Sequence, residues 1–135
     1  MSYPIEEIEG IGPANGTKLK AAGINDTDAL LKLCSDKKGR DAMAEKSGIG
    51  ASTLLNWANM ADMMRVKGVG RQYSELLKAS GVDTIKELRT RRADNLATKM
   101  SEVNAAKKLA KATPNESMIA GWIEAAKTMD PLITH

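Results

Sequence analysis

The sequence predicts an all-α fold, and three observations lead to this prediction. The 135 residues include no Phe, two Tyr and two Trp, so Leu, Ile, Val, Ala and eight Met must form the core. Aromatic and β-branched residues, which favour sheets, are scarce. Apolar residues recur at helical spacing between short breaks that contain glycine. One pattern of glycines also occurs twice, which is typical of an internal duplication.

The first half is predicted to contain five short helices. A helix over residues 4–8 carries Glu6 and Glu7 in its first turn, where the helix dipole favours acids. A second helix covers residues 13–22 and ends at Gly23. Asp26 or Thr27 caps a third helix over residues 28–34. Two more helices follow: one that Asp36 caps and that runs through Ala44, and one that Ala51 or Ser52 opens after the break Gly48-Ile49-Gly50.

The second half repeats this order. A shift of 58 residues aligns both glycine pairs, the helix-ending glycines and the apolar positions around them: Ile8 with Val66, Gly10 with Gly68, Gly12 with Gly70, Leu19 with Leu77, Gly23 with Gly81, and Leu30 with Leu88. A shift of 65 residues aligns Trp57 with Trp122 and Ala61 with Ala126. The difference predicts a longer helix over residues 93–112. Thr113 is then expected to cap the next helix, with Pro114 at its first position and Glu116 three residues after the cap. Residues 131–135 are expected to be irregular.

The repeat divides the chain into residues 1–64 and residues 65–135. Because isolated helices of this length are marginal in water, the two repeat units are expected to pack together as one compact helical bundle. Both tryptophans occupy matched places in apolar stripes, so they are expected in the core.

The charge permits nucleic-acid binding without requiring it. The net charge is +3, with an isoelectric point near 9.0, and residues 65–95 carry eight Lys and Arg against four acids. Cys34 is the only cysteine, which suits a reducing compartment. No apolar run resembles a signal peptide or a membrane span, so a soluble, cytoplasmic protein without a membrane partner is expected.

The two glycine pairs are the strongest candidate for a binding site. Each lies in a segment of the form apolar-x-Gly-apolar-Gly, at residues 8–12 and 66–70. Two glycines let the backbone turn sharply, and a helix start leaves backbone N–H groups open to an anion such as phosphate. The alternative is a plain tight turn between helices. A third pair, Gly48-Ile49-Gly50, lacks the preceding apolar residue and is interpreted as a plain break.

These segments resemble helix-hairpin-helix proteins, and the chain from Tyr3 to about His135 resembles the family DUF4332, a domain of unknown function. The segments that carry the resemblance include Ile8-Glu9-Gly10-Ile11-Gly12-Pro13, Lys38-Gly39-Arg40, Trp57-Ala58-Asn59-Met60-Ala61-Asp62, Arg65-Val66-Lys67-Gly68-Val69-Gly70 and Trp122-Ile123-Glu124-Ala125-Ala126-Lys127. The resemblance implies a duplicated helix-hairpin-helix fold of the SAM-like kind. The family name itself implies no activity.

Helix-hairpin-helix modules often hold DNA without reading its sequence, and the resemblance implies such a role here. The implied phosphate-binding residues are Lys67, Gly68, Val69, Gly70, Arg71 and Lys78 at the second turn, and Gly10 and Gly12 at the first, where Lys18 and Lys20 are the candidate cations. Arg89, Arg91 and Arg92, with Lys86 nearby, form the densest basic patch, and Arg89 and Arg92 are expected to share a helix face. Hairpin carbonyls in such modules can also hold K⁺ or Na⁺, and no other cofactor is expected. Three acids flank the first turn and Pro13 removes an amide, so the second turn is the better candidate.

The leading hypothesis is therefore a DNA-binding protein that prefers double-stranded DNA, without sequence specificity. The alternative is a helical adaptor that binds another protein, because a small helical fold does not fix a function. An enzyme is not expected, because the only His is the last residue and the acids form no evident inward-facing pair. Without a Cys/His ligand spacing no structural zinc site is expected, and no small-molecule substrate is expected.

Overall fold

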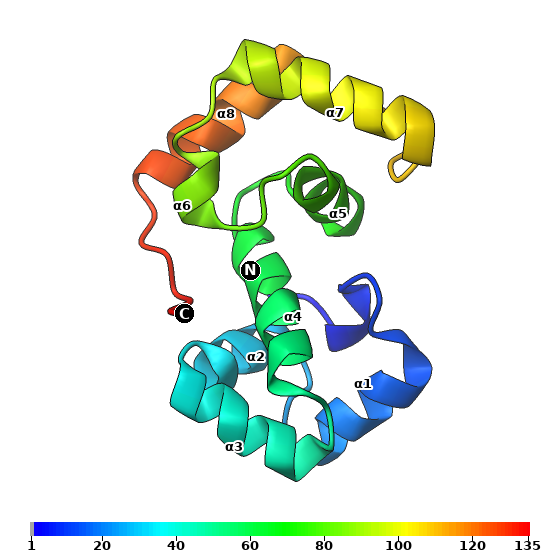
Figure 1. Ribbon diagram of the computed structural model, residues 1–135, viewed down its shortest axis with the longest axis vertical. Coiled ribbons are helices and arrows are strands. Elements are labelled where there is room, and N and C mark those ends of the chain that lie inside the picture. Colours follow the sequence, from blue (N-terminus) through cyan, green and yellow to red (C-terminus); the bar gives the residue numbers. More distant parts are fainter. Residues whose placement is uncertain (1) are drawn as a thin grey trace. The chain divides into compact units, whose positions relative to one another are not determined.

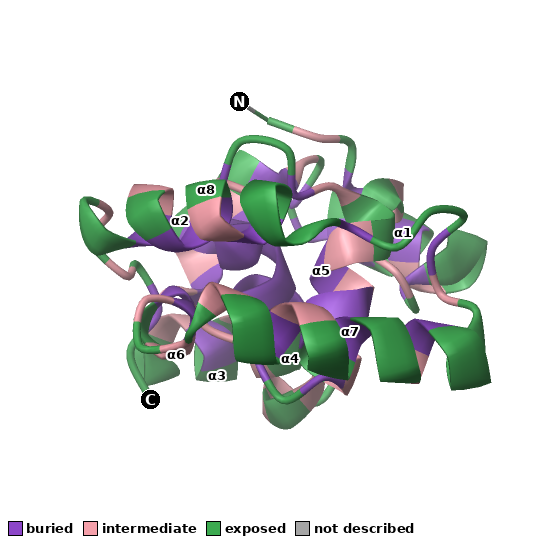
Figure 2. Cartoon of the chain, turned by 90° about the horizontal axis from the view of Figure 1, so that it is seen from above, coloured by how far each residue is buried: buried purple, intermediate pink, exposed green. Residues whose placement is uncertain are grey.

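A computed structural model describes residues 2–135, and its regular elements are helices (Figure 1). The predicted all-α class is therefore confirmed. Most helices turn one buried face inward and one exposed face outward (Figure 2). The elements in chain order are η1 (Ile5–Glu7), α1 (Gly12–Ala21), α2 (Thr27–Cys34), α3 (Lys37–Ser47), α4 (Ala51–Met63), α5 (Arg71–Ala79), α6 (Ile85–Leu88), α7 (Ala93–Lys107) and α8 (Glu116–Lys127).

The chain forms two compact units. The first comprises the residues through Asp62 together with Leu132–His135, and the second comprises Met63–Pro131. In the first unit α2 packs on α3, and α1 contacts both η1 and α3. Its buried side chains include Ile5, Ile8, Ile11, Leu19, Ile24, Leu30, Leu54 and Trp57. None of the described helices is both long enough and apolar enough to cross a membrane.

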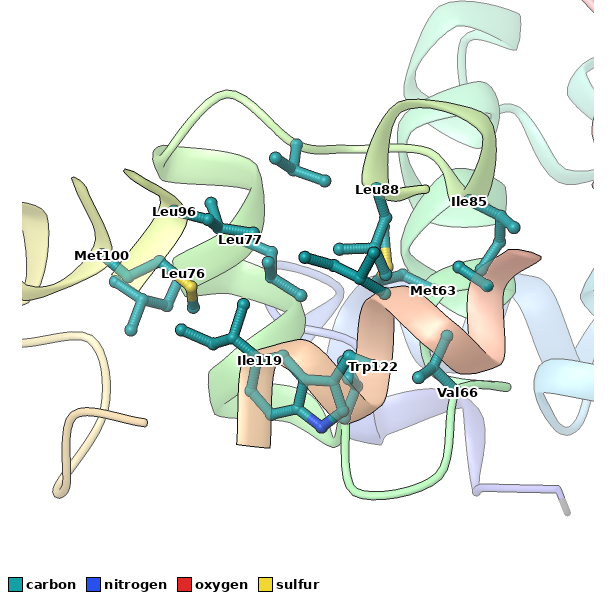
Figure 3. Close-up of a cluster of buried hydrophobic side chains, with 14 of the residues drawn as sticks. Met63, Val66, Leu76, Leu77, Ile85, Leu88, Leu96, Met100, Ile119 and Trp122 are labelled. Carbon is teal, nitrogen blue, oxygen red and sulfur yellow. The ribbon is translucent and has the colours of Figure 1, made fainter. Parts of the chain in front are cut away.

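The second unit is organised around Trp122. Helix α7 lies alongside α8, α5 packs on α7, and α6 packs on α8 (Figure 1). Trp122 belongs to the cluster of buried side chains of this unit, which also includes Val66, Leu76, Leu77, Ile85, Leu88, Leu96, Met100 and Ile119 (Figure 3). Trp122 is 4% exposed and Trp57 is 7% exposed, so the expectation that both tryptophans belong to the core is confirmed.

The predicted helix-ending glycines stop α1 and α5 in the same way. Gly23 and Gly81 have φ values of 95° and 94°. Ile24 N donates to Leu19 O and Val82 N donates to Leu77 O, each at 2.8 Å. These are the bonds of a Schellman motif, which needs a left-handed residue after the helix and therefore favours glycine.

Side-chain caps account for four of the helix starts, those of α2, α3, α6 and α8. Asp36 Oδ1 accepts from Gly39 N at 2.7 Å, as the sequence predicts, and of the two candidates for the helix before it Asp26 is the cap, because its Oδ1 accepts from Ala29 N at 2.8 Å. Three predicted boundaries are wrong. The first helix is a 3₁₀ turn over Ile5–Glu7, and the helix after Asp36 continues past Ala44 to Ser47. The last helix begins at Glu116 with Asn115 as its cap, because Asn115 Oδ1, rather than Thr113, accepts from Met118 N.

The predicted helix over residues 93–112 is also too long, because α7 ends at Lys107. The side chain of Asn104, a residue that is 8% exposed, causes α7 to end early. Its Oδ1 accepts from Ala110 N at 2.9 Å, and its Nδ2 donates to Ala110 O and Thr113 Oγ1, each at 3.1 Å. Lys108 turns the chain with φ 53° and ψ 47°. The side chain of Asn104 thus satisfies backbone groups that a longer helix would have paired with one another.

The C-terminal residues lack regular structure, as predicted, yet hydrogen bonds hold them against the other residues of the first unit. Thr134 N donates to Ser35 O at 2.8 Å, and Leu132 N donates to Asp62 Oδ2 at 3.3 Å. Cys34 is fully buried at the end of α2. Burial raises the pKa of its thiol to about 11, and the nearby charge of Arg40 offsets only part of this shift.

Candidate nucleic-acid interface

The second glycine turn, Val66–Arg71, places its apolar residues inward and its glycines outward. Val66 and Val69 are 1% and 0% exposed, whereas Lys67 and Gly68 are exposed. Val66 N donates to Met63 O and Val69 N donates to Val66 O, which closes two consecutive tight turns. Helix α5 then begins at Arg71, with Gly70 as its extended N-cap residue at φ −101° and ψ −159°.

This turn leaves backbone donors available for an anion. Within residues 2–135, no acceptor pairs with the N–H of Gly68 or of Gly70. Unpaired N–H groups at the start of a helix carry the positive end of its dipole. Lys67 and Arg71 lie on either side of these amides and are exposed. The turn therefore has both donors and positive charge where phosphate oxygens could bind.

The indole of Trp122 packs against the second turn at Gly68. Gly68 has φ 91°, and a Cβ atom added there would lie 3.2 Å from Nε1 of Trp122. In Figure 3 the indole nitrogen of Trp122 lies on the edge of the ring that points away from Leu88 and Met63. The Tyr73 ring from the first turn of α5 packs against the same indole, with 5.3 Å between ring centroids. Packing against a buried ring therefore fixes the position of the turn.

The first turn resembles the second at its first glycine and differs at its second. Gly10 has φ 93°, and Trp57 Nε1 lies 3.9 Å from its virtual Cβ. Gly12, however, has φ 68°, in contrast to the extended Gly70. Pro13 follows Gly12 and disfavours the right-handed helical conformation for it. The same proline has no N–H to offer, so this turn presents fewer donors.

Acidic side chains also surround the first turn, as the sequence indicates. Glu6 forms an ion pair with Lys20. The hydrogen bond from Lys20 lowers the pKa of the Glu6 carboxyl, so Glu6 is charged at neutral pH. Both lysines of α1 are exposed, but Lys20 pairs with this acid, whereas no ion pair is found for Lys18 among residues 2–135. The first turn is accordingly the weaker candidate for phosphate.

We expect Gly68→Ala to destabilise the protein more than Gly10→Ala does. Both changes put a side chain at positive φ, which costs about 1–2 kcal/mol. At Gly68 the new Cβ also meets Trp122 at 3.2 Å, against 3.9 Å at Gly10, which adds up to about 1 kcal/mol. Urea unfolding followed by far-UV circular dichroism measures the difference. Gly70→Ala is the control, because its Cβ meets nothing within 4 Å. Equal losses at Gly68 and Gly10 would show that the indole contact adds nothing.

The remaining predicted basic residues are only partly suited to phosphate. Lys78 is exposed in the last turn of α5. Arg89 follows the end of α6 and is half-buried, and its Nε has no hydrogen-bond partner among the described residues. Arg92 caps α7 and pairs with Asp94 at 3.0 Å. The predicted shared helix face is wrong, because α6 ends at Leu88, before both arginines.

Charge differs strongly between the two units. The segment Met63–Pro131 contains thirteen Lys and Arg and eight Asp and Glu, which gives a net charge of +5. The rest of the chain contains seven and nine respectively, which gives −2. The positive field therefore belongs to the unit that carries the second turn.

The structure adds residues that the sequence did not connect to the second turn. Gln72, in the first turn of α5, accepts a hydrogen bond from Lys111 N at 3.1 Å. In the sequence, Lys107, Lys108 and Lys111 form a basic group on the helix predicted over residues 93–112 that is weaker than the patch around Arg89. The early end of α7 is what carries Lys108 and Lys111 to the start of α5. No signal in the sequence pairs Gln72 with Lys111, 39 residues away.

Comparison with known proteins gives one match. The sequence model of a family described as Domain of unknown function (DUF4332) matches residues 9–129. No curated protein and no solved structure matches the chain.

Proposed function

The chain belongs to the DUF4332 family, and we propose that it binds the phosphate backbone of double-stranded DNA without reading base sequence. The observation that carries the proposal is the second turn: unpaired amides at Gly68 and Gly70 between Lys67 and Arg71, in a unit of net charge +5. Contacts of this kind position a protein on DNA but carry no sequence information. The proposal treats both glycine turns as helix-hairpin-helix motifs, with the second as the main contact and no catalytic step.

Gly70 offers a test that leaves the fold intact. Its backbone is extended and a Cβ there meets nothing within 4 Å, so other residues fit without strain. Asp and Asn are both good N-cap residues and stabilise a helix start relative to glycine. Gly70→Asp adds a negative charge at the phosphate position, and Gly70→Asn adds a side chain of the same shape without the charge.

We expect Gly70→Asp to lose about tenfold or more in affinity for a random-sequence duplex, because a like charge beside a phosphate costs more than about 1 kcal/mol. Gly70→Asn should stay within about threefold of the wild type. Fluorescence anisotropy at several salt concentrations measures both affinities. For the wild type, the slope of log affinity against log salt should be about −0.9 for each phosphate contact.

The outcomes separate DNA binding from other functions. If the wild-type protein fails to bind duplex at low salt, the DNA proposal is wrong. Equal affinities of Gly70→Asp and the wild type for duplex DNA would show that the second turn does not contact the DNA. A preference for single strands would change the ligand but not the site.

The alternative function is a protein-binding adaptor, and the ion pairs of the second unit favour it. Arg92 pairs with Asp94, and Arg91 pairs with Glu87, so part of the basic patch is neutralised within the chain. Against an adaptor of the groove-binding kind, Met118 and Leu132 are the only large apolar side chains in residues 2–135 that are exposed. Such a surface offers little apolar area to a partner helix.

A further inference from the structure

An open pocket of about 430 Å³ adjoins the second turn, within the second unit. It lies between the first turn of α5 and the loop that follows α7. Its lining comprises Gln72, Asn104, Lys108, Leu109, Ala110 and Lys111. Gln72, which lies two residues after Gly70 in the chain, is the residue of α5 that lines the pocket.

Hydrogen-bond donors remain available among the side chains of this pocket. Gln72 Oε1 accepts from Lys111 N, which leaves the NH₂ group of the Gln72 side chain for a ligand. Both polar atoms of the Asn104 side chain are occupied by Ala110 and Thr113. Lys108 and Lys111 are exposed, and no acidic side chain of residues 2–135 pairs with either. A site made of donors and cations selects an anion.

The loop that carries the lysines is ordered before any ligand binds. Asn104 makes three hydrogen bonds to it, and Gln72 fixes the backbone of Lys111. Lys108 adopts φ 53° there, a left-handed conformation that L-residues adopt at a cost and that is often found at functional sites. Ordering the loop in advance removes an entropy cost that binding would otherwise carry.

The helix dipoles do not cancel this positive charge. The C-terminus of α7 brings about half a negative charge to the loop, and the N-terminus of α5 brings about half a positive charge. Lys108 and Lys111 add two full positive charges. The net field in the pocket is therefore positive.

We infer that this pocket is a second phosphate site, held by Lys108, Lys111 and the side-chain amide of Gln72. The inference rests on the proposed function for its physiological ligand, which is a further phosphate of the strand bound at the second turn. Gly68 and Gly70 would hold one phosphate with backbone donors, and the pocket would hold another with side chains. The DNA footprint thus extends from the start of α5 to the end of α7.

A matched pair of double variants tests the pocket with the full chain. Lys108→Asn/Lys111→Gln removes both pocket cations, and Asn tolerates the left-handed conformation at position 108. Lys86→Gln/Lys99→Gln removes two exposed cations of the same unit that do not line the pocket. We expect the pocket variant to reduce the salt slope for duplex binding by about 1–2, and the control variant to reduce it by less than about 0.5. Equal reductions would overturn the inference and leave the proposed function standing.

A second measurement separates the pocket from DNA binding. Inorganic phosphate is titrated into ¹⁵N-labelled protein, and the side-chain amide of Gln72 and the backbone N–H of Lys111 are followed by NMR. We expect saturable shifts in the wild type that the pocket variant loses and the control variant keeps. Shifts without any duplex binding would support the phosphate site and contradict DNA as its ligand. Equal shifts in the wild type and the pocket variant, or no shifts at all, would overturn the site itself.

Discussion

Gly39→Ala is expected to destabilise the first unit by about 2 kcal/mol or more, although alanine is the better helix former by about 1 kcal/mol. Gly39 lies in the first turn of α3, where its N–H donates to the Asp36 cap. A Cβ there would lie 2.2 Å from Leu33 O and 3.0 Å from Asp36 Oδ1. Because the first of these is a backbone atom, the turn between α2 and α3 must move to relieve the contact.

A second glycine within a helix provides a matched control for Gly39→Ala. Gly121 lies within α8, is exposed, and has nothing within 4 Å of its virtual Cβ. Gly121→Ala should therefore gain about 0.5–1 kcal/mol from helix propensity alone. Both variants are compared by urea unfolding, with the free energy of unfolding as the measured quantity. A gain in stability at Gly39 similar to that at Gly121 would contradict the close approach to Leu33.

Arg40→Met is expected to cost about 3 kcal/mol, because it removes a charged donor from buried carbonyls. Arg40 is 4% exposed. Its Nη1 donates to Cys34 O at 3.1 Å and to Ser35 O at 3.0 Å, and its Nη2 donates to Thr134 O at 2.7 Å. The guanidinium thus caps the end of α2 and holds the C-terminal residues at the same time.

Two further variants show how much of the stability lost in Arg40→Met comes from the guanidinium geometry and how much from the contact with Thr134. Arg40→Lys keeps the charge but not the planar fork of donors, so it should recover less than half of the loss. Truncation after Ile133 keeps the buried Ile133, removes Thr134 and leaves the bonds to Cys34 and Ser35, so it should cost less than Arg40→Met. Urea unfolding gives the stabilities, and hydrogen exchange shows whether the Thr134 amide loses protection. An Arg40→Met protein within about 1 kcal/mol of the wild type would show that these carbonyls find other partners.

Local features of the sequence predicted the helices, several of their caps and the glycine turns between them well. The caps Asp26 and Asp36, the helix-ending Gly23 and Gly81, and the tight turns at Gly10 and Gly68 all depend on residues within one or two turns of chain. Such features act through short-range hydrogen bonds and backbone sterics, which a sequence displays directly. The burial of Trp57 and Trp122 followed from the same kind of evidence, the spacing of apolar residues along a helix.

The errors arose where a distant or buried side chain overrides a local pattern. Apolar spacing continued to residue 110, but Asn104 bonds to Ala110 and ends α7 at Lys107. Thr113 and Pro114 have the composition of a helix start, yet Thr113 Oγ1 accepts from Asn104 and Asn115 becomes the cap. In both cases a buried polar group had to be satisfied, and its partners decided the boundary.

The sequence by itself determined that this protein is all-helical, where most helices begin and end, and that two glycine turns precede helices. Only the tertiary structure decided which of the basic residues gather at one place. It paired Arg92 with Asp94, left Arg89 half-buried, and brought Lys108 and Lys111 to Gln72. The physical reason is the separation along the chain of the residues that interact. Caps and turns form between near neighbours in sequence, whereas a binding surface forms between distant residues that only packing brings together.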